Sequence, residues 1–185
     1  MNIKLVYKSK SGFTKRYAQW ISQETGCELI PLKTCSAASV SGCDVFIYGS
    51  RMHAGRLDGL DKARKLFAAS GAGQLLVFAT GGMPNSAVDT IAEMWENNLS
   101  ADERKAIPHF YMQAGICYEK LGLFDKAMMK MAASMMAKQQ DNSPMRQQIA
   151  QAVKGSYDIS DRKFIVPLVE MLKGESCGAQ GAAFE

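Results

Sequence analysis

The chain has 185 residues, of which 47% are hydrophobic and 22% charged, with a formal net charge of +4 at pH 7. That length fits one domain with its own core, and the balance of apolar and charged residues excludes a wholly disordered chain. No run approaches the roughly 20 apolar residues that a membrane-spanning helix needs, and a small charge spread along the chain gives little support to nucleic-acid binding.

The cysteines indicate a reducing compartment. There are five, an odd number, and no two form a C-x-x-C pair. This pattern argues against a zinc site or a redox dithiol, so we expect reduced thiols, a cytoplasmic location and no metal. The first predicted strand begins at residue 3, which leaves no room for a signal peptide.

The first predicted strand, residues 3–7, is apolar and leads into a short polar loop and then a helix over residues 13–25. A single glycine in such a loop lets the backbone approach an anion, and the amides of the first helical turn point at that anion. Hydroxyl groups add further donors. We therefore interpret the loop as a phosphate site formed by Ser9, Lys10, Ser11, Gly12, Phe13 and Thr14. The alternative is an ordinary surface turn, and Lys10 either touches the ligand or faces solvent.

Strand and helix patterns alternate along the rest of the chain. Further strands are predicted at residues 27–32, 44–49, 74–79 and 109–115, and further helices at 57–69, around 91–95, from Ser100 and across 164–172. This alternation predicts an α/β domain with a parallel sheet and right-handed crossovers. Ligands of such sheets lie at the carboxyl ends of the strands, where the strand order reverses.

Two more polar loops lie at that predicted edge. Candidate ligand residues are Ser50, Arg51, Met52, His53, Ala54 and Gly55 after the strand at 44–49, and Thr80, Gly81, Gly82 and Met83 after the strand at 74–79. Neither these loops nor the first one contains Asp or Glu between residues 8–14, 50–56 and 80–85. The three loops together predict a site for an anionic ligand.

The motif Ser9-Lys10-Ser11-Gly12-Phe13-Thr14 resembles the phosphate loop of the flavodoxins. Tyr48-Gly49-Ser50 and Ala114-Gly115-Ile116-Cys117-Tyr118, with the helical pattern that follows, resemble the flavodoxin-type protoporphyrinogen dehydrogenase branch of that family. The resemblance implies a doubly wound, five-stranded parallel sheet of order 2-1-3-4-5 and non-covalent FMN. It also implies redox work, with quinone-coupled oxidation of protoporphyrinogen if the branch holds.

The resemblance also gives roles to particular residues. Cations at Arg51, His53 and Arg56 would stabilise negative charge on a reduced flavin, and His53 is the catalytic candidate, the alternative being a plain polar residue. Met52, His53 and Met83 stand where aromatic residues flank the flavin in acidic flavodoxins, and Tyr118 is the nearest aromatic candidate. His109 is expected to be structural.

We expect one domain over residues 1–173, with an inserted helical segment at about 116–157, and a flexible tail over 174–185. Within the insert, residues 124–138 form a methionine-rich, lysine-bearing helical pattern that either fills the core or contacts a membrane or partner. The partner is expected to be a redox protein or a quinone or porphyrin substrate. A generic electron carrier and a non-catalytic, flavin-dependent interaction protein remain alternatives.

Overall fold

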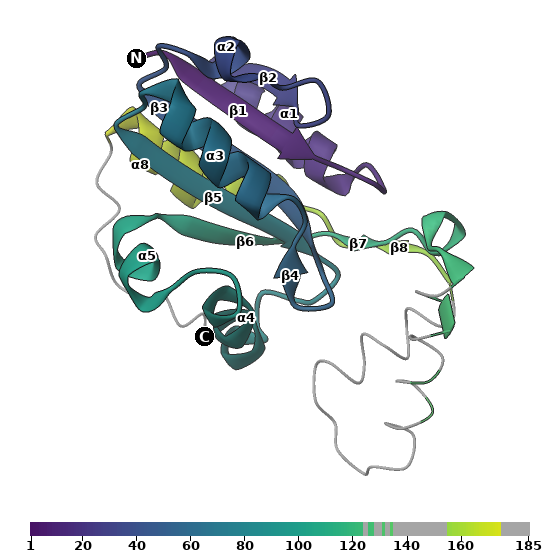
Figure 1. Cartoon of the computed structure of the whole chain (residues 1–185). Coiled ribbons are helices and arrows are strands. Elements are labelled where there is room, and N and C mark those ends of the chain that lie inside the picture. The colour runs from purple at the N-terminus through teal and green to yellow at the C-terminus, as the bar shows by residue number, and fades with distance from the viewer. Residues whose placement is uncertain (124–125, 128–130, 132–133, 135–154, 175–185) are drawn as a thin grey trace.

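The computed structural model describes residues 1–123, 126–127, 131, 134 and 155–174, which form a three-layer α/β sandwich (Figure 1). The parallel strands are β1 (Ile3–Lys8), β2 (Glu28–Pro31), β3 (Val45–His53), β5 (Gln74–Gly81) and β6 (His109–Gln113). They lie in the order β2-β1-β3-β5-β6. Numbered among themselves, these five strands have the predicted order 2-1-3-4-5, so the predicted fold class is confirmed.

Helices cover both faces of the sheet. One face packs against α1 (Phe13–Thr25), the 3₁₀ turn η2 (Arg162–Ile165) and α8 (Val166–Lys173). The other packs against α2 (Ala37–Val40), α3 (Leu60–Ser70) and α4 (Val88–Glu96), with the short α5 (Ala101–Ala106) beyond α4. Strands covered on both faces are apolar along their length, which explains the nearly continuous hydrophobic runs of β3 and β5.

The packing of β3 on β5 requires a glycine at position 49. A Cβ atom on Gly49 would lie 2.0 Å from Cζ of Phe78, a residue that is itself fully buried. The ring of Phe78 therefore occupies the space that any larger side chain at position 49 would need. Gly49 and Phe78 are paired in the register of β3 and β5, which also places Ser50 beside Ala79 at the carboxyl ends of the two strands.

The second polar loop is not a loop, and this corrects the sequence prediction. Strand β3 continues to His53 and turns back through Ala54 and Gly55 into β4 (Arg56–Leu57), with His53 opposite Arg56. Both turn residues have positive φ, 48° and 74°, the two-residue geometry that suits the twist of a hairpin. Because residues 56–57 belong to β4, α3 starts at Leu60 and not at the predicted residue 57.

The chain leaves the sheet after β6 and returns through a small antiparallel pair. Strand β7 (Gly115–Ile116) pairs with β8 (Tyr157–Asp158), and the turn η1 (Tyr118–Lys120) follows β7. The predicted helix over 124–138 falls almost wholly outside the described residues, as does the predicted tail beyond Gly174. The division into one domain with an insert stays a prediction. No helix in the described part of the chain is long and apolar enough to cross a membrane.

Candidate functional site

The N-terminus of α1 is open in the manner of an anion site. Gly12 is its N-cap residue, with a φ of 108°, and among the described residues no side chain caps the helix and no carboxylate lies in its first turn. By contrast, Ser100 and Glu103 cap α5 reciprocally. The unpaired amides at the start of the 13-residue α1 carry partial positive charge and suit a phosphate group.

The loop before α1 is held in shape by its own hydroxyls and by the sheet. Ser9 Oγ accepts a hydrogen bond from the amide of Gly12 at 3.2 Å. The Oγ1 atoms of Thr14 and Thr80 lie 2.8 Å apart, and both side chains are buried. This contact joins the first and third predicted loops across the sheet edge. The role of Thr14 as a phosphate ligand stays a prediction.

In the second predicted loop, Asp58 organises the neighbouring side chains. Arg51 Nε donates to Asp58 Oδ2 at 2.7 Å, and both side chains are about three-quarters buried, with 20% and 25% exposed. Ser50 Oγ donates to the carbonyl of Asp58 at 2.7 Å, and the hydroxyl of Tyr48 donates to the same carbonyl. Ser50 is fully buried. The sequence prediction missed Asp58, which lies two residues beyond the loop as drawn, and the ion pair shows that Arg51 is not an uncompensated cation.

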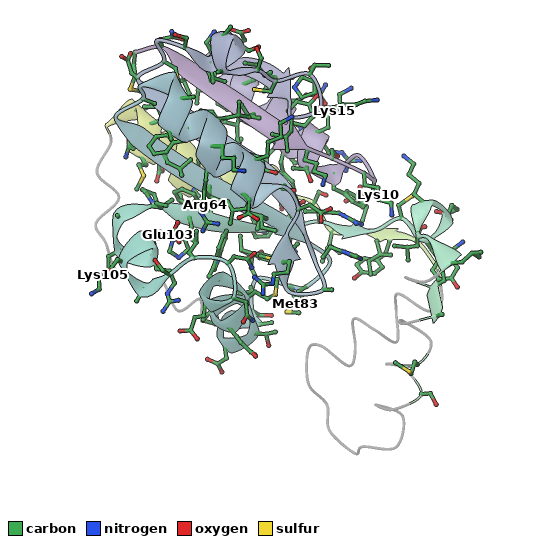
Figure 2. All side chains as sticks on the ribbon, viewed as in Figure 1. Lys10, Lys15, Arg64, Met83, Glu103 and Lys105 are labelled. Carbon is green, nitrogen blue, oxygen red and sulfur yellow. The ribbon has the colours of Figure 1, made fainter. Side chains whose placement is uncertain are left out.

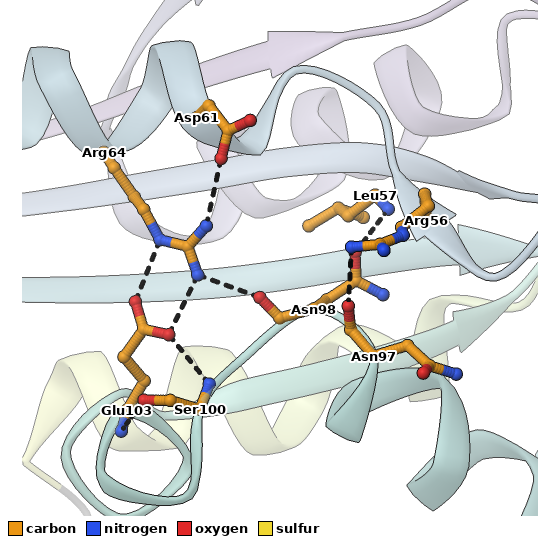
Figure 3. A network of polar contacts seen from close by, with 8 residues as sticks. All are labelled: Arg56, Leu57, Asp61, Arg64, Asn97, Asn98, Ser100 and Glu103. Atoms are coloured by element: carbon orange, nitrogen blue, oxygen red, sulfur yellow. Dashed lines mark hydrogen bonds and ion pairs between the residues drawn. The ribbon is translucent and has the colours of Figure 1, made fainter.

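Residues between α4 and α5 form hydrogen bonds with the hairpin turn and with β4 (Figure 3). Asn98 Nδ2 donates to the carbonyl of Gly55 at 2.7 Å, and Asn98 Oδ1 accepts from the amide of Leu57 at 2.7 Å. Arg56 Nη1 donates to the carbonyl of Asn97 at 3.0 Å. Met52 and His53 are half-buried in this hairpin. Asn98 therefore holds the backbone on the β4 side of the turn, at Gly55 and Leu57.

Arg64 on α3 completes this network. Its guanidinium forms a two-pronged ion pair with Glu103, with both nitrogen–oxygen distances at 2.9 Å, and donates to the carbonyl of Asn98 at 2.8 Å. Burial alone would raise the pKa of Glu103, but hydrogen bonds from Ser100 and Arg64 outweigh it and lower that pKa. The ionised form of Glu103 is thus part of what holds α5 and Asn98 in place.

The third predicted loop is fixed by residues that follow it in the chain. The hydroxyl of Tyr111 accepts from the amide of Met83 at 3.1 Å and donates to its carbonyl at 3.0 Å. Tyr157 on β8 donates its hydroxyl to the carbonyl of Gly82 at 2.9 Å. Burial raises the pKa of Tyr111, so the phenol stays protonated and keeps its donor. Figure 2 shows Met83 and Lys10, from the third and first loops, on the same side of the molecule.

Tyr118 is the first residue of η1, which follows β7. Its amide donates to Ser156 Oγ at 2.7 Å, and the ammonium of Lys126 lies 4.9 Å from its ring centroid. Lys120 of the same turn donates to the carbonyl of Ser11 at 3.1 Å, which brings η1 to the phosphate loop. His109 is structural as expected. Its Nδ1 lies 2.8 Å from the carbonyl oxygen of Ile107, and the centroid of its ring lies 4.8 Å from the ring centroid of Trp95.

The model of the flavodoxin domain matches residues 4–143 of this chain. The chain belongs to the flavodoxin domain family. The cofactor of that family is FMN, so the cofactor prediction is confirmed, and the open N-terminus of α1 suits its phosphate. The individual ligand residues stay predictions. No curated protein matches the sequence.

The solved structures that are similar to this domain share little sequence with it. They include a flavodoxin from the domain Archaea, with 12% identity over 94% of this chain and 99% of that one at a TM-score of 0.43. The Flv1 flavodiiron core from Synechocystis sp. PCC6803 has 19% identity and a TM-score of 0.43 over 61% of this chain, which spans only 29% of that protein. The rubredoxin oxygen:oxidoreductase from Desulfovibrio gigas has 12% identity and a TM-score of 0.46, covering 94% and 36% of the two chains.

Proposed function

We propose that this flavodoxin domain holds one FMN at the carboxyl ends of β1, β3 and β5 and uses it in oxidation and reduction. The observation that carries the proposal is the uncapped N-terminus of α1 behind a glycine of left-handed conformation. The loop at residues 9–14 would bind the phosphate, and the hairpin at 50–56 and the loop at 80–83 would border the ring. Bound FMN supplies one- or two-electron redox chemistry, and the protein orients the ring and limits water around it.

Within the family, we propose an oxidoreductase that acts on a quinone or porphyrin, in preference to a generic low-potential electron carrier. Two features support this choice. The hairpin carries the cation Arg56 at the start of β4, whose guanidinium bonds a carbonyl and, among the described residues, no carboxylate. In addition, the segment that begins at β7 reaches the phosphate loop through Lys120. An enzyme that accepts a substrate needs more protein around its cofactor than a simple carrier does, and this segment adds protein at the phosphate loop.

Purification in the presence of FMN tests the cofactor proposal directly. We expect a flavin absorbance spectrum, release of FMN and not FAD on denaturation, and quenched flavin fluorescence on binding. A wild-type protein that neither quenches added FMN nor gains thermal stability from it would refute the proposal. Oxidation of protoporphyrinogen with a quinone acceptor then separates the enzyme from the carrier: FMN binding without turnover leaves the carrier as the better description.

A further inference from the structure

A basic cavity lies beside the phosphate loop, on the side of β2. It has a volume of about 350 Å³ and is lined by the end of β1, the loop before α1, the end of β2 and η1. The side chains of five lysines line it: Lys8, Lys10, Lys15, Lys33 and Lys120. None of the described residues that line it is a carboxylate. The cavity is therefore a concentration of positive charge in a domain whose net charge is only +4.

Carboxylates near the cavity form ion pairs with cations outside it and do not balance the charge of the cavity lysines. Arg16, next to Lys15 in α1, forms an ion pair with Asp158 on β8, and Lys4 in β1 forms one with Glu28. Lys8, Lys15, Lys33 and Lys120 form no ion pair with any residue that the structure describes. All four are exposed. Lysines left unpaired on one side of a protein raise the local positive potential.

The phosphate of FMN does not account for this charge. A phosphate monoester carries about −1.5 to −2 charges at neutral pH, whereas four ammonium groups line the cavity even when Lys10 is left aside. Lys33, which follows β2, is also separated from the loop of residues 9–14 in sequence and comes from a different strand end. A second anionic partner is needed to match the cavity.

The type of cation indicates the type of partner. Every charged side chain among the described lining residues is a lysine and none is an arginine. Arginine provides the rigid, two-pronged fork that suits a fixed phosphate or carboxylate, whereas lysine is a flexible point charge. Exposed point charges contribute mainly to steering and orientation of an oppositely charged protein surface.

We propose that this lysine-lined cavity is the docking surface for an acidic redox protein, which it holds against the flavin edge of the domain. The inference rests on the proposed FMN site, because that site gives the docked protein its reason to approach. Each encounter passes one electron between the partner's redox centre and the flavin, so one is oxidised by one electron and the other reduced by one. The surface steers the partner's carboxylates, and no covalent bond forms or breaks.

The test measures binding of a plant-type [2Fe–2S] ferredoxin of strongly negative net charge, labelled with a fluorophore, by anisotropy at low and high salt. We expect wild-type affinity to fall steeply as salt rises. At low salt, Lys33→Glu and Lys15→Glu should each weaken binding about five- to tenfold. Lys105→Glu makes the same charge change on the opposite side of the molecule (Figure 2) and should change the affinity less than about twofold.

A basic probe gives the opposite expectation and guards against loss of fold. Cytochrome c, which is positively charged, should bind the Lys33→Glu variant more tightly than the wild type, a result that a misfolded variant would not give. Equal effects of Lys33→Glu and Lys105→Glu, or binding that does not respond to salt, would overturn the proposal. So would variants that lose FMN affinity but keep ferredoxin affinity, because the cavity would then serve the FMN phosphate alone. Failure of the wild type to bind FMN at all would instead refute the proposed function.

Discussion

Removal of one hydroxyl, by the substitution Tyr111→Phe, should measurably destabilise the domain. That hydroxyl accepts from the amide of Met83 and donates to its carbonyl, at 3.1 and 3.0 Å. Tyr111 and Met83 are only 8% and 9% exposed, so water cannot readily replace the lost partner. The change leaves both backbone groups of Met83 unsatisfied at almost constant side-chain volume.

The cost follows from the two broken hydrogen bonds. A buried polar group without a partner costs about 1–3 kcal/mol, and two such groups that share one lost partner give a combined cost of about 2–4 kcal/mol. For a domain of this size about 3 kcal/mol corresponds to a fall in Tm of roughly 6–12 °C. In urea, the midpoint should move while the slope m stays unchanged, because the surface exposed on unfolding hardly differs.

Tyr7→Phe is the matched control. Tyr7 is a half-buried tyrosine whose hydroxyl has no hydrogen bond to a described residue, so its loss should change stability by less than about 0.5 kcal/mol. Both variants are compared without FMN, so that a change in cofactor affinity cannot mimic a change in folding. Equal stability of Tyr111→Phe and Tyr7→Phe would show that the Tyr111 hydroxyl does not fasten the loop at residues 80–83.

Three further outcomes are expected. Gly12→Val should abolish FMN binding in a fluorescence titration, because a β-branched residue does not tolerate the φ of 108° that the phosphate loop adopts there; unchanged binding would remove this loop from the site. Asp58→Asn should make the midpoint potential of bound FMN more positive by on the order of tens of millivolts, because the substitution leaves the positive charge of Arg51 without its ion pair. Arg51→Ala should not make that potential more positive. Equal potentials of the two variants in a redox titration would place the ion pair away from the ring. Glu103→Gln should lower stability near neutral pH but not in acid. The folded-state pKa of Glu103 is lowered, so its contribution is present above the unfolded value of about 4.3 and is lost as pH falls through the folded value; urea midpoints that stay equally far apart at every pH would contradict this.

Local patterns predicted the parts of the fold that local chemistry determines. The helix over residues 13–25 is found at those residues because glycines of left-handed conformation, Gly12 and Gly26, bound it on both sides. The capping box at Ser100 and Glu103 is present, and Pro167 lies in the first turn of α8. In each case residues within one turn of the boundary decide where the helix begins or ends.

The parts that sequence reasoning missed depend on partners far along the chain. Ser50, Arg51 and Met52 look like loop residues, but pairing with β5 and β4 makes them strand. Asp58 lies only seven residues from Arg51, yet their ion pair forms because the hairpin folds one strand over the other. A carboxylate just past the predicted loop was the signal available, and pairing Arg51 with it required knowledge of the two-residue turn.

The residues that fix the predicted FMN loops mostly lie outside those loops. Asn98 holds the hairpin turn, Tyr111 and Tyr157 hold the third loop, and Lys120 contacts the first. A loop that is already fixed loses little conformational entropy when a ligand binds, so each of these contacts supports FMN affinity without a need to touch FMN. Lys120 lies in η1, just after the chain leaves the sheet, and Tyr157 lies in β8, where the chain comes back to it. η1 is thereby linked to the loop at residues 9–14, and β8 to the loop at residues 80–83. A partner or substrate that moves β8 or η1 would change how tightly those loops are held, and with them the environment of the cofactor.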